Sequence, residues 1–344
     1  MKHLKCSSIN CNQVVIIQKQ LHHFEISRDA YASYYLALDK GFNLKEFVEL
    51  EVQFASPNLP RGLRYTYVVD SCNGLVCLRE FDYCFFLWNP ATNQCRNVSP
   101  PDLGDNNLRI CRSWFGFAYV SSTDDYIIVC LMTFEEKVCH YMFSLRAGKW
   151  IKVDSLDENN FYKLYYSHGY AVDDTMYWPP ENFDKKGSDM IALNLVSGQL
   201  RKIPLMNFGI NYSYFRVSQI KGCLSLYCMS VTNTSPHLLV TDVWMLKQRD
   251  NWDSWEKMFT LRDTFSSLLH IFDTGECLVK QGANQLMLHS PSHAALKEYE
   301  EGSVMWHTSE QDPLFHSLHA RGYVESLISP FGTPWYEDDN ETPE

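Results

Sequence analysis

At residues 70–78 the chain reads Asp70-Ser71-Cys72-Asn73-Gly74-Leu75-Val76-Cys77-Leu78, in which two apolar runs flank an Asn-Gly pair. A two-residue β-hairpin turn needs positive φ angles, which Asn and Gly adopt at the least steric cost. Short apolar runs on both sides of such a turn are typical of β-strands. We therefore predict a tight β-hairpin whose turn is Asn73-Gly74.

Turns of this kind recur along the chain at a nearly constant interval. Polar turn residues between apolar runs are centred at positions 73, 124, 174, 222 and 275, so successive turns are 51, 50, 48 and 53 residues apart. A second unit, in which an apolar run, a polar turn and another strand-like run follow one another, is anchored at 39, 89, 144, 194, 246 and 290. Because the two units are out of phase and share one interval, the sequence contains an internal repeat of about 50 residues.

Two hairpins in each repeat amount to four strands, and kelch-type propeller blades are four-stranded sheets with this period. A single sheet cannot bury both of its faces, so neighbouring repeats must pack around an axis. We predict an all-β, kelch-like β-propeller of about six four-stranded blades at residues 12–330, closed by a terminal strand near Val324 that pairs with N-terminal strands. Residues 1–11 are expected to form an N-terminal segment, and residues 331–344 an acidic, disordered tail. The best candidate for a helix is residues 292–299.

The composition excludes several classes of protein. The 344 residues include 20 Tyr, 20 Phe and 9 Trp, and 45% of them are hydrophobic, which excludes wholesale disorder. The formal net charge is −11 and we find no basic stripe, so nucleic acid is not an expected partner. Neither a secretory leader nor a run of about 18 apolar residues is found, so we expect no membrane partner and a cytoplasmic or nuclear location.

The 12 cysteines include no C-x-x-C pair, so we expect reduced thiols and no metal site. Motifs of nucleophilic, phosphate-binding or zinc-dependent catalysis are also missing. His22 and His23 are adjacent and would point to opposite faces of a strand, and Ser290-Pro291 separates His289 from His293. We predict that the protein is not an enzyme and has no cofactor. A second hypothesis, an enzymatic or sugar-binding propeller, would gain support from several carboxylates or histidines converging on the axis.

Recognition by a propeller resides in the loops between its blades. Residues 207–215 gather four aromatic side chains among small polar ones, as binding loops do. The candidate partner-binding residues are therefore Phe208, Tyr212, Tyr214 and Phe215. The alternative is that Tyr212, Tyr214 and Phe215 pack at the start of the next strand.

Several of these motifs together resemble one known family. Residues 70–78, followed by Leu87-Trp88-Asn89-Pro90-Ala91-Thr92, resemble the opening signature of the plant F-box-associated domain. The later motifs of that domain are similar to four further segments, Phe115 to Tyr126, Ser144 to Val153, Asp189 to Pro204 and Asp242 to Phe259. Its C-terminal strand is similar to Tyr323 to Ser329. The resemblance covers roughly residues 12–330. It implies structural roles for Asn73, Gly74, Trp88, Asn89, Pro90, Trp244 and Trp255.

Members of this family typically carry an N-terminal F-box that binds the Skp-type adaptor of a cullin–RING ubiquitin ligase. The resemblance therefore implies a domain that selects a target protein for ubiquitination. Residues 1–40 lack the Leu-Pro start and the helices of an F-box, and the Leu59-Pro60 pair precedes no helix. Adaptor and cullin are thus expected partners only if an F-box lies upstream. The alternative is a truncated propeller that binds a partner without joining the ligase.

Overall fold

The structure is a computed structural model. It describes residues 13–21, 30–38, 44–49, 67–80, 84–92, 94–103, 110–134, 137–153, 169–179, 189–206, 208, 212–232, 235–264, 266–272, 275–281, 285–289, 304–305, 318–324 and 326–331. The predicted helix at 292–299 and the segment 1–11 lie outside the described residues, as does the tail beyond residue 331. Within the described ranges, no helix has the length and apolar character needed to cross a membrane.

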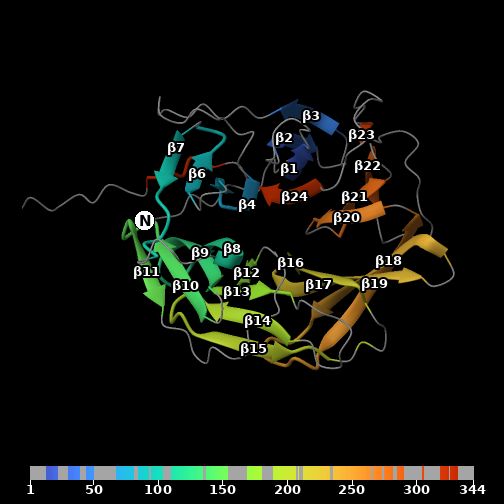
Figure 1. The fold of residues 1–344 in the computed structure, drawn as a ribbon. Helices are drawn as coiled ribbons and strands as arrows, with labels where there is room; N and C mark the ends of the chain where they lie inside the picture. The colour runs from blue at the N-terminus through green and yellow to red at the C-terminus, as the bar shows by residue number, and fades with distance from the viewer. Residues whose placement is uncertain are drawn as a thin grey trace, which may run out of the picture.

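The fold is all-β, in a propeller arrangement (Figure 1). The described strands pair, antiparallel throughout, into six four-stranded sheets. Each sheet is given from its inner strand outward, and the first three are β4(Tyr67–Cys72), β5(Leu75–Arg79), β6(Phe85–Asn89) and β7(Gln94–Val98); β8(Ile110–Val120), β9(Asp125–Phe134), β10(Lys137–Ser144) and β11(Lys149–Val153); and β12(Tyr170–Val172), β13(Thr175–Trp178), β14(Asp189–Asn194) and β15(Leu200–Pro204). The next two are β16(Tyr214–Ile220), β17(Cys223–Thr232), β18(Ser235–Leu246) and β19(Trp255–Thr264); and β20(Ser266–Ile271), β21(Cys277–Gln281), β22(Gln285–His289) and β23(Val304–Met305). The sixth sheet combines both ends of the chain: β24(Leu318–Tyr323), β1(Gln13–Leu21), β2(Ala30–Leu38) and β3(Leu44–Glu49).

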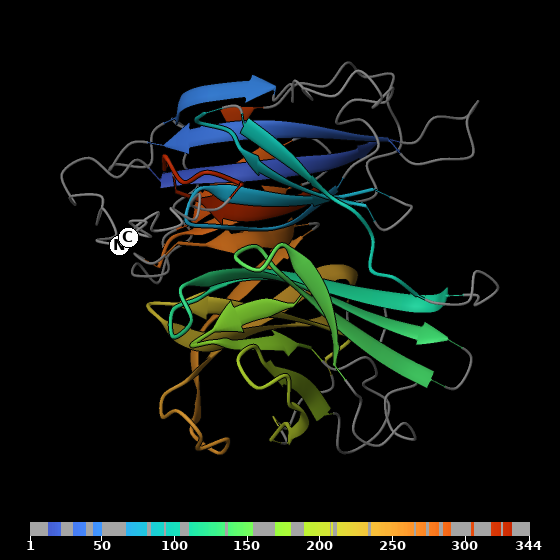
Figure 2. The same cartoon turned by 90° about the vertical axis from the view of Figure 1, so that its left-hand side faces the viewer.

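One sheet joins the two ends of the chain. The C-terminal strand β24 pairs with β1 in a register that runs from Val14 opposite Tyr323 to Lys19 opposite Leu318. Figure 2 shows the blue N-terminal strands beside the red C-terminal one. On its other side β24 contacts β4, the inner strand of the next sheet. The prediction that a C-terminal strand pairs with N-terminal strands is therefore confirmed.

Three of the five hairpin turns that defined the repeat have positive φ at both central residues. Asn73 and Gly74 have φ angles of 49° and 84°, and Lys221 and Gly222 have 52° and 79°. At Asp173-Asp174 both residues are also left-handed, with φ angles of 49° and 56°. Positive φ at both central residues is the mark of the type I′ turn, whose twist matches that of paired strands. The interpretation of Asp173-Asp174 as a turn is thus confirmed.

The hydrophobic core lies between neighbouring sheets. Along β9 the buried side chains alternate: Ile128 and Cys130 pack on the β4–β7 sheet, whereas Ile127 and Val129 pack on the β12–β15 sheet. Alternation of this kind follows from the period of two along a strand. Strands that are buried on both faces, such as β5, β6 and β13, are therefore continuous apolar runs, whereas the outer strands β7 and β11 carry exposed polar residues. Each sheet depends on both of its neighbours for burial.

Residues 324 and 326–331, which we call the C-terminal strap, continue beyond β24 across the β4–β7 sheet. The Asn89 side-chain amide donates to the carbonyls of Ser326 and Ile328, at 2.9 and 2.8 Å. The Ser326 hydroxyl donates to the Asn73 carbonyl at 2.6 Å. We expected a strand through Ser329, and this was wrong: β24 ends at Tyr323, because the chain there binds turn residues rather than a strand edge.

Gly74 is required at its position for two reasons, which a pair of variants separates. A Cβ at Gly74 would lie 2.1 Å from Ser326 Oγ and 2.8 Å from the Ser326 backbone nitrogen. A Cβ at Gly222, in the same turn type, would have its nearest neighbour at 3.8 Å. We expect Gly222→Ala to lower the free energy of unfolding by about 1 kcal/mol through φ strain alone. Gly74→Ala should lower it by about 2–3 kcal/mol, because the strap must also move. Urea unfolding of both variants measures this difference, and equal losses would show that the strap contributes nothing.

Candidate functional site at the propeller axis

A small polar cavity lies where the inner strands converge. Its volume is about 30 Å³, and β4, β12, β16, β17, β20 and β24 contribute to its lining. The polar residues that line it are Asp70, Ser71, Tyr170, Arg216, Ser218, Tyr227, His270 and Arg321. Strands from the first and the last parts of the chain thus supply one buried polar cluster, which we call the axial cluster.

An ion pair within the axial cluster joins β4 to β24. Arg321 Nε lies 3.4 Å from Asp70 Oδ1, and both side chains are largely buried. Burial raises the pKa of Asp70 to about 6, against the opposing effects of Arg321 and of the Ser71 amide. Arg321 Nε also lies 3.4 Å from the Val69 carbonyl, and the Ser71 hydroxyl donates to the Gly322 carbonyl. Polar contacts therefore join β4 to β24, the inner strands of two neighbouring sheets.

Arg216 and His270 complete the charged part of the axial cluster. Arg216 Nη1 lies 3.4 Å from the carbonyls of Leu268 and Leu269. Burial lowers the pKa of His270 to about 4, and the charges of Arg321 and Arg216 act in the same direction. His270 is therefore neutral at pH 7. Burial also raises the pKa of Tyr227, which remains a hydroxyl donor.

The predicted aromatic binding residues fall into two groups. Tyr212 and Phe215 are buried and Phe208 packs against them, with ring centroids of Phe208 and Trp244 4.7 Å apart. The Tyr212 hydroxyl donates to Asp242 Oδ2 at 2.6 Å, and Lys257 Nζ lies 2.8 Å from the same oxygen. Burial and this carboxylate raise the pKa of Tyr212. These three side chains pack in the core between the β12–β15 and β16–β19 sheets. For Tyr212 and Phe215 this agrees with the alternative given above, that they pack at the start of the next strand.

Tyr214 is the exception, because 46% of it is exposed. It is the first residue of β16, at the end opposite the Lys221-Gly222 turn. Alternation along β16 places Tyr214 on the same side as Arg216 and Ser218, and places Phe215 and Val217 in the core. A partner-binding role for the aromatic set stays a prediction, and Tyr214 is its accessible member.

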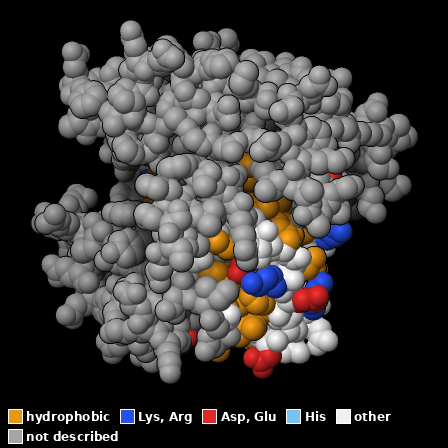
Figure 3. All heavy atoms as spheres, turned by 90° about the vertical axis from the view of Figure 1, so that its right-hand side faces the viewer, with side chains coloured by type: hydrophobic (Ala, Val, Ile, Leu, Met, Phe, Trp, Pro, Cys, Tyr) orange, Lys and Arg blue, Asp and Glu red, His pale blue; other side chains and the backbone are white. Residues whose placement is uncertain are grey.

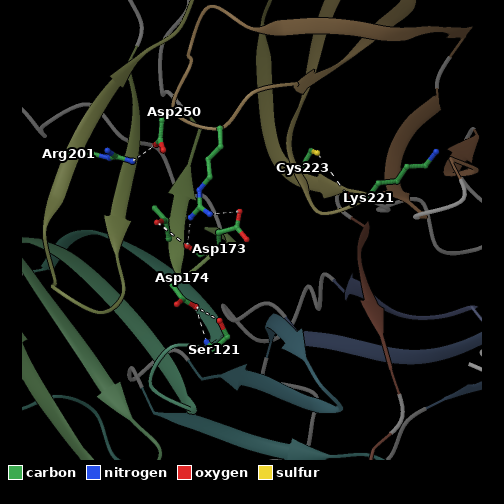
Figure 4. A network of polar contacts seen from close by, with 9 residues as sticks. Ser121, Asp173, Asp174, Arg201, Lys221, Cys223 and Asp250 are labelled. Atoms are coloured by element: carbon green, nitrogen blue, oxygen red, sulfur yellow. Dashed lines mark hydrogen bonds and ion pairs between the residues drawn. The ribbon is translucent and has the colours of Figure 1, made fainter. Parts of the chain in front are cut away.

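A second polar network joins the turns of three sheets (Figure 4). Asp174 accepts hydrogen bonds from the Ser121 amide at 2.8 Å and from the Ser121 hydroxyl at 3.3 Å. Burial raises the pKa of Asp174, but the hydrogen bonds from Ser122 and Ser121 outweigh it and the net direction is down. Arg249 lies 3.6 Å from the Asp173 carboxylate, with both side chains more than half exposed. Exposed ion pairs contribute little stability. The role that remains for this network is to hold the turns of neighbouring sheets in position.

The residues with structural roles implied by the resemblance occupy core and turn positions. Asn89 Oδ1 accepts from the amides of Ala91 and Thr92, which closes the turn that contains Pro90. Asn194 makes the equivalent bonds to Val196 and Ser197 two repeats later, so the repeat has a physical basis in this side-chain-capped turn. Trp88 and Trp255 are buried, and Trp244 packs against the core cluster that contains Trp255.

Among the described residues on the face that Figure 3 shows, charges of both signs lie close together. Figure 3 shows Lys and Arg side chains beside Asp and Glu side chains, with hydrophobic groups between them. Lys247 and Glu256 form one exposed pair of opposite charges, with 3.2 Å between Nζ and Oε2. The described lining of the axial cavity contains one carboxylate and one histidine. The convergence of several such groups that would favour an enzymatic propeller is therefore not seen in the described lining.

Comparison with known proteins gives a family and several distant relatives. The family described as F-box associated beta propeller domain matches residues 26–330. An F-box/kelch-repeat protein of Arabidopsis thaliana is 24% identical over 273 residues, which are 78% of this chain and 70% of the relative. The F-box protein CPR1 of Arabidopsis thaliana is 26% identical over 226 residues, 57% of this chain and 52% of the relative. The aligned region therefore spans about half to 70% of the length of these relatives.

Solved structures show weaker similarity. An oligogalacturonate lyase in complex with manganese is 10% identical, with a TM-score of 0.42, and the match covers 83% of this chain and 80% of that one.

Proposed function

The chain belongs to the F-box associated beta propeller domain family, and from this we propose that it is a protein-recognition module. We further propose that it selects a target protein for ubiquitination by an SCF-type ligase. The observation that carries the proposal is the family match over residues 26–330, which covers every described strand from β2 to β24 and leaves out β1. Both Arabidopsis relatives are F-box proteins, which supports the link to a ligase.

We infer that each four-stranded sheet is one blade, which makes a kelch-like propeller of six blades at residues 12–330. The pairing of β24 with β1 supports this, because it joins the first described strand to the last inner strand. We also propose a location in the cytoplasm or nucleus, the location that the sequence analysis predicts.

We propose that Tyr214 contacts the target. Tyr and Trp side chains supply much of the binding energy at protein interfaces when the surface beneath them is rigid. Phe215 and Tyr212, on either side of Tyr214, are fixed in the core. An exposed aromatic ring on such a support loses little conformational entropy when it binds.

Affinity capture with the full chain and added Skp-type adaptor tests the proposal. We expect a target from plant extract to be retained by the wild type and by Met258→Ser, and reduced at least tenfold by Tyr214→Ser. Met258 is a matched control because it is a similarly exposed hydrophobic residue on the outer strand β19. Retention of the adaptor as well would support ligase assembly. A target without adaptor would favour the alternative, a partner-binding propeller outside the ligase, and capture of neither would refute both.

A further inference from the structure

The axial cavity contains more positive than negative charge. Arg216 and Arg321 are cationic, and Asp70 is the one carboxylate among the described residues that line the cavity. His270 contributes no charge at pH 7, since its pKa is held at about 4. The described lining thus has a net charge of +1, from two guanidinium groups and one carboxylate.

The excess charge resides at Arg216. Asp70 is paired with Arg321, at 3.4 Å between Oδ1 and Nε. Arg216 has no ion pair among the described residues, and its hydrogen bonds are two long ones of 3.4 Å to the neutral carbonyls of Leu268 and Leu269. A partly buried cation without a counter-charge is costly, and an anion beside it removes that cost.

The cavity limits the size of any such anion. A water molecule needs roughly 10–15 Å³ of space measured in this way, so about 30 Å³ holds two water-sized groups. Chloride, bromide or formate fits this space, whereas gluconate is far too large. The remaining lining includes Tyr170, Ser218 and Tyr227, and a hydroxyl group is a suitable donor to an anion.

We propose that the axial cavity binds one small monovalent anion, of the size of chloride or formate, between the guanidinium groups of Arg216 and Arg321. The anion balances the charge of the axial cluster. It also joins β16 to β24, two inner strands from different sheets, and so stabilises the ring. This site is independent of the proposed partner-binding role, because it requires no second macromolecule.

Thermal unfolding of the full chain at constant ionic strength tests this site. Replacing gluconate by chloride, bromide or formate should raise the Tm of the wild type saturably, by about 2–4 °C. Arg216→Met should abolish the increase, and Arg249→Met, at an exposed arginine in the turn network, should preserve it. Equal Tm values of the wild type in all four anions, or an undiminished increase in Arg216→Met, would overturn the proposal.

A second measurement does not depend on the folding of any variant. Crystals of the wild-type chain soaked in bromide should show an anomalous scattering peak between Arg216 and Arg321. A cavity that contains only water in such crystals would refute the site. If Arg216→Met fails to fold, this peak decides the question alone.

Discussion

A chain that ends at residue 317 is expected to lose cooperative unfolding altogether. This truncation removes β24, and with it the strand that pairs with β1 and that supplies Arg321 to Asp70. Sheets in such a ring bury both faces against neighbours, so an open ring exposes the apolar faces of two sheets at once. The loss should equal most of the total stability, which is about 5–15 kcal/mol for a folded domain.

Two longer chains provide the controls. A chain that ends at residue 331 keeps every described contact and should unfold like the full chain. A chain that ends at residue 323 keeps β24 but loses the C-terminal strap, and with it the hydrogen bonds of Asn89 to Ser326 and Ile328. We expect it to remain folded with stability reduced by about 2–4 kcal/mol. Urea unfolding followed by tryptophan fluorescence distinguishes the three lengths. A cooperative transition in the chain that ends at 317 would show that β24 does not close the ring.

The second large effect concerns pH. The pKa of Asp70 is raised from 3.8 to about 6, so Asp70 stabilises the folded state below pH 4 and this contribution is lost as pH rises through 6. The pKa of His270 is lowered from 6.5 to about 4, so its contribution is present above pH 6.5 and is lost as pH falls through 4. Each contribution amounts to about 3 kcal/mol. Because they have opposite signs over the same pH range, they nearly cancel in the wild type.

Single variants should expose the two hidden contributions. Relative to the double variant Asp70→Asn/His270→Asn, the His270→Asn variant should lose about 3 kcal/mol of unfolding free energy between pH 4 and pH 7. Asp70→Asn should gain about as much over the same range, since burial, together with the charge of Arg321, still lowers the pKa of His270. Urea unfolding at fixed chloride concentration gives these profiles. Parallel profiles for all four proteins would contradict the burial of both groups at the axis.

The fold could be predicted from the sequence to the extent that it depends on local turn chemistry. The residue types of the Asn73-Gly74 and Lys221-Gly222 turns predict the positive φ angles that the structure has. The recurrence of such turns about every 50 residues indicates four-stranded sheets. The C-terminal strap could not be found in this way. Its contacts join Ser326 to Asn73 and Asn89, more than two hundred residues away, and no local pattern records them.

The axial cluster was missed for a related reason. Its members are single polar residues on strands, and each taken alone reads as an ordinary strand residue. A signal was nevertheless present: Asp70, Tyr170, Ser218 and His270 each lie three residues before the first residue of a predicted hairpin turn, and these first residues are at 73, 173, 221 and 273. Aligning the repeats on their turns would place these four at equivalent positions facing one axis. Arg321 has no such turn and required the pairing of β24 with β1.

The aromatic segment shows the opposite limit. Four rings in residues 207–215 are compatible with a binding loop and with a core cluster, because both uses select Tyr and Phe, and burial is the commoner use of aromatic side chains. Alternation along β16 decides between them: Phe215 points into the core, whereas Tyr214 is exposed on the side of Arg216. The start of β16 at Tyr214 was needed to assign these directions.

Equilibrium binding of the captured target to the purified full chain, measured by titration calorimetry, tests most directly whether this propeller recognises a protein. We expect a one-to-one complex whose Kd rises at least tenfold in Tyr214→Ser, which is about 1.4 kcal/mol, and stays unchanged in Met258→Ser. If the purified chain binds none of the captured proteins, protein recognition is contradicted. If the wild type, Tyr214→Ser and Met258→Ser bind with the same Kd, recognition through Tyr214 is contradicted.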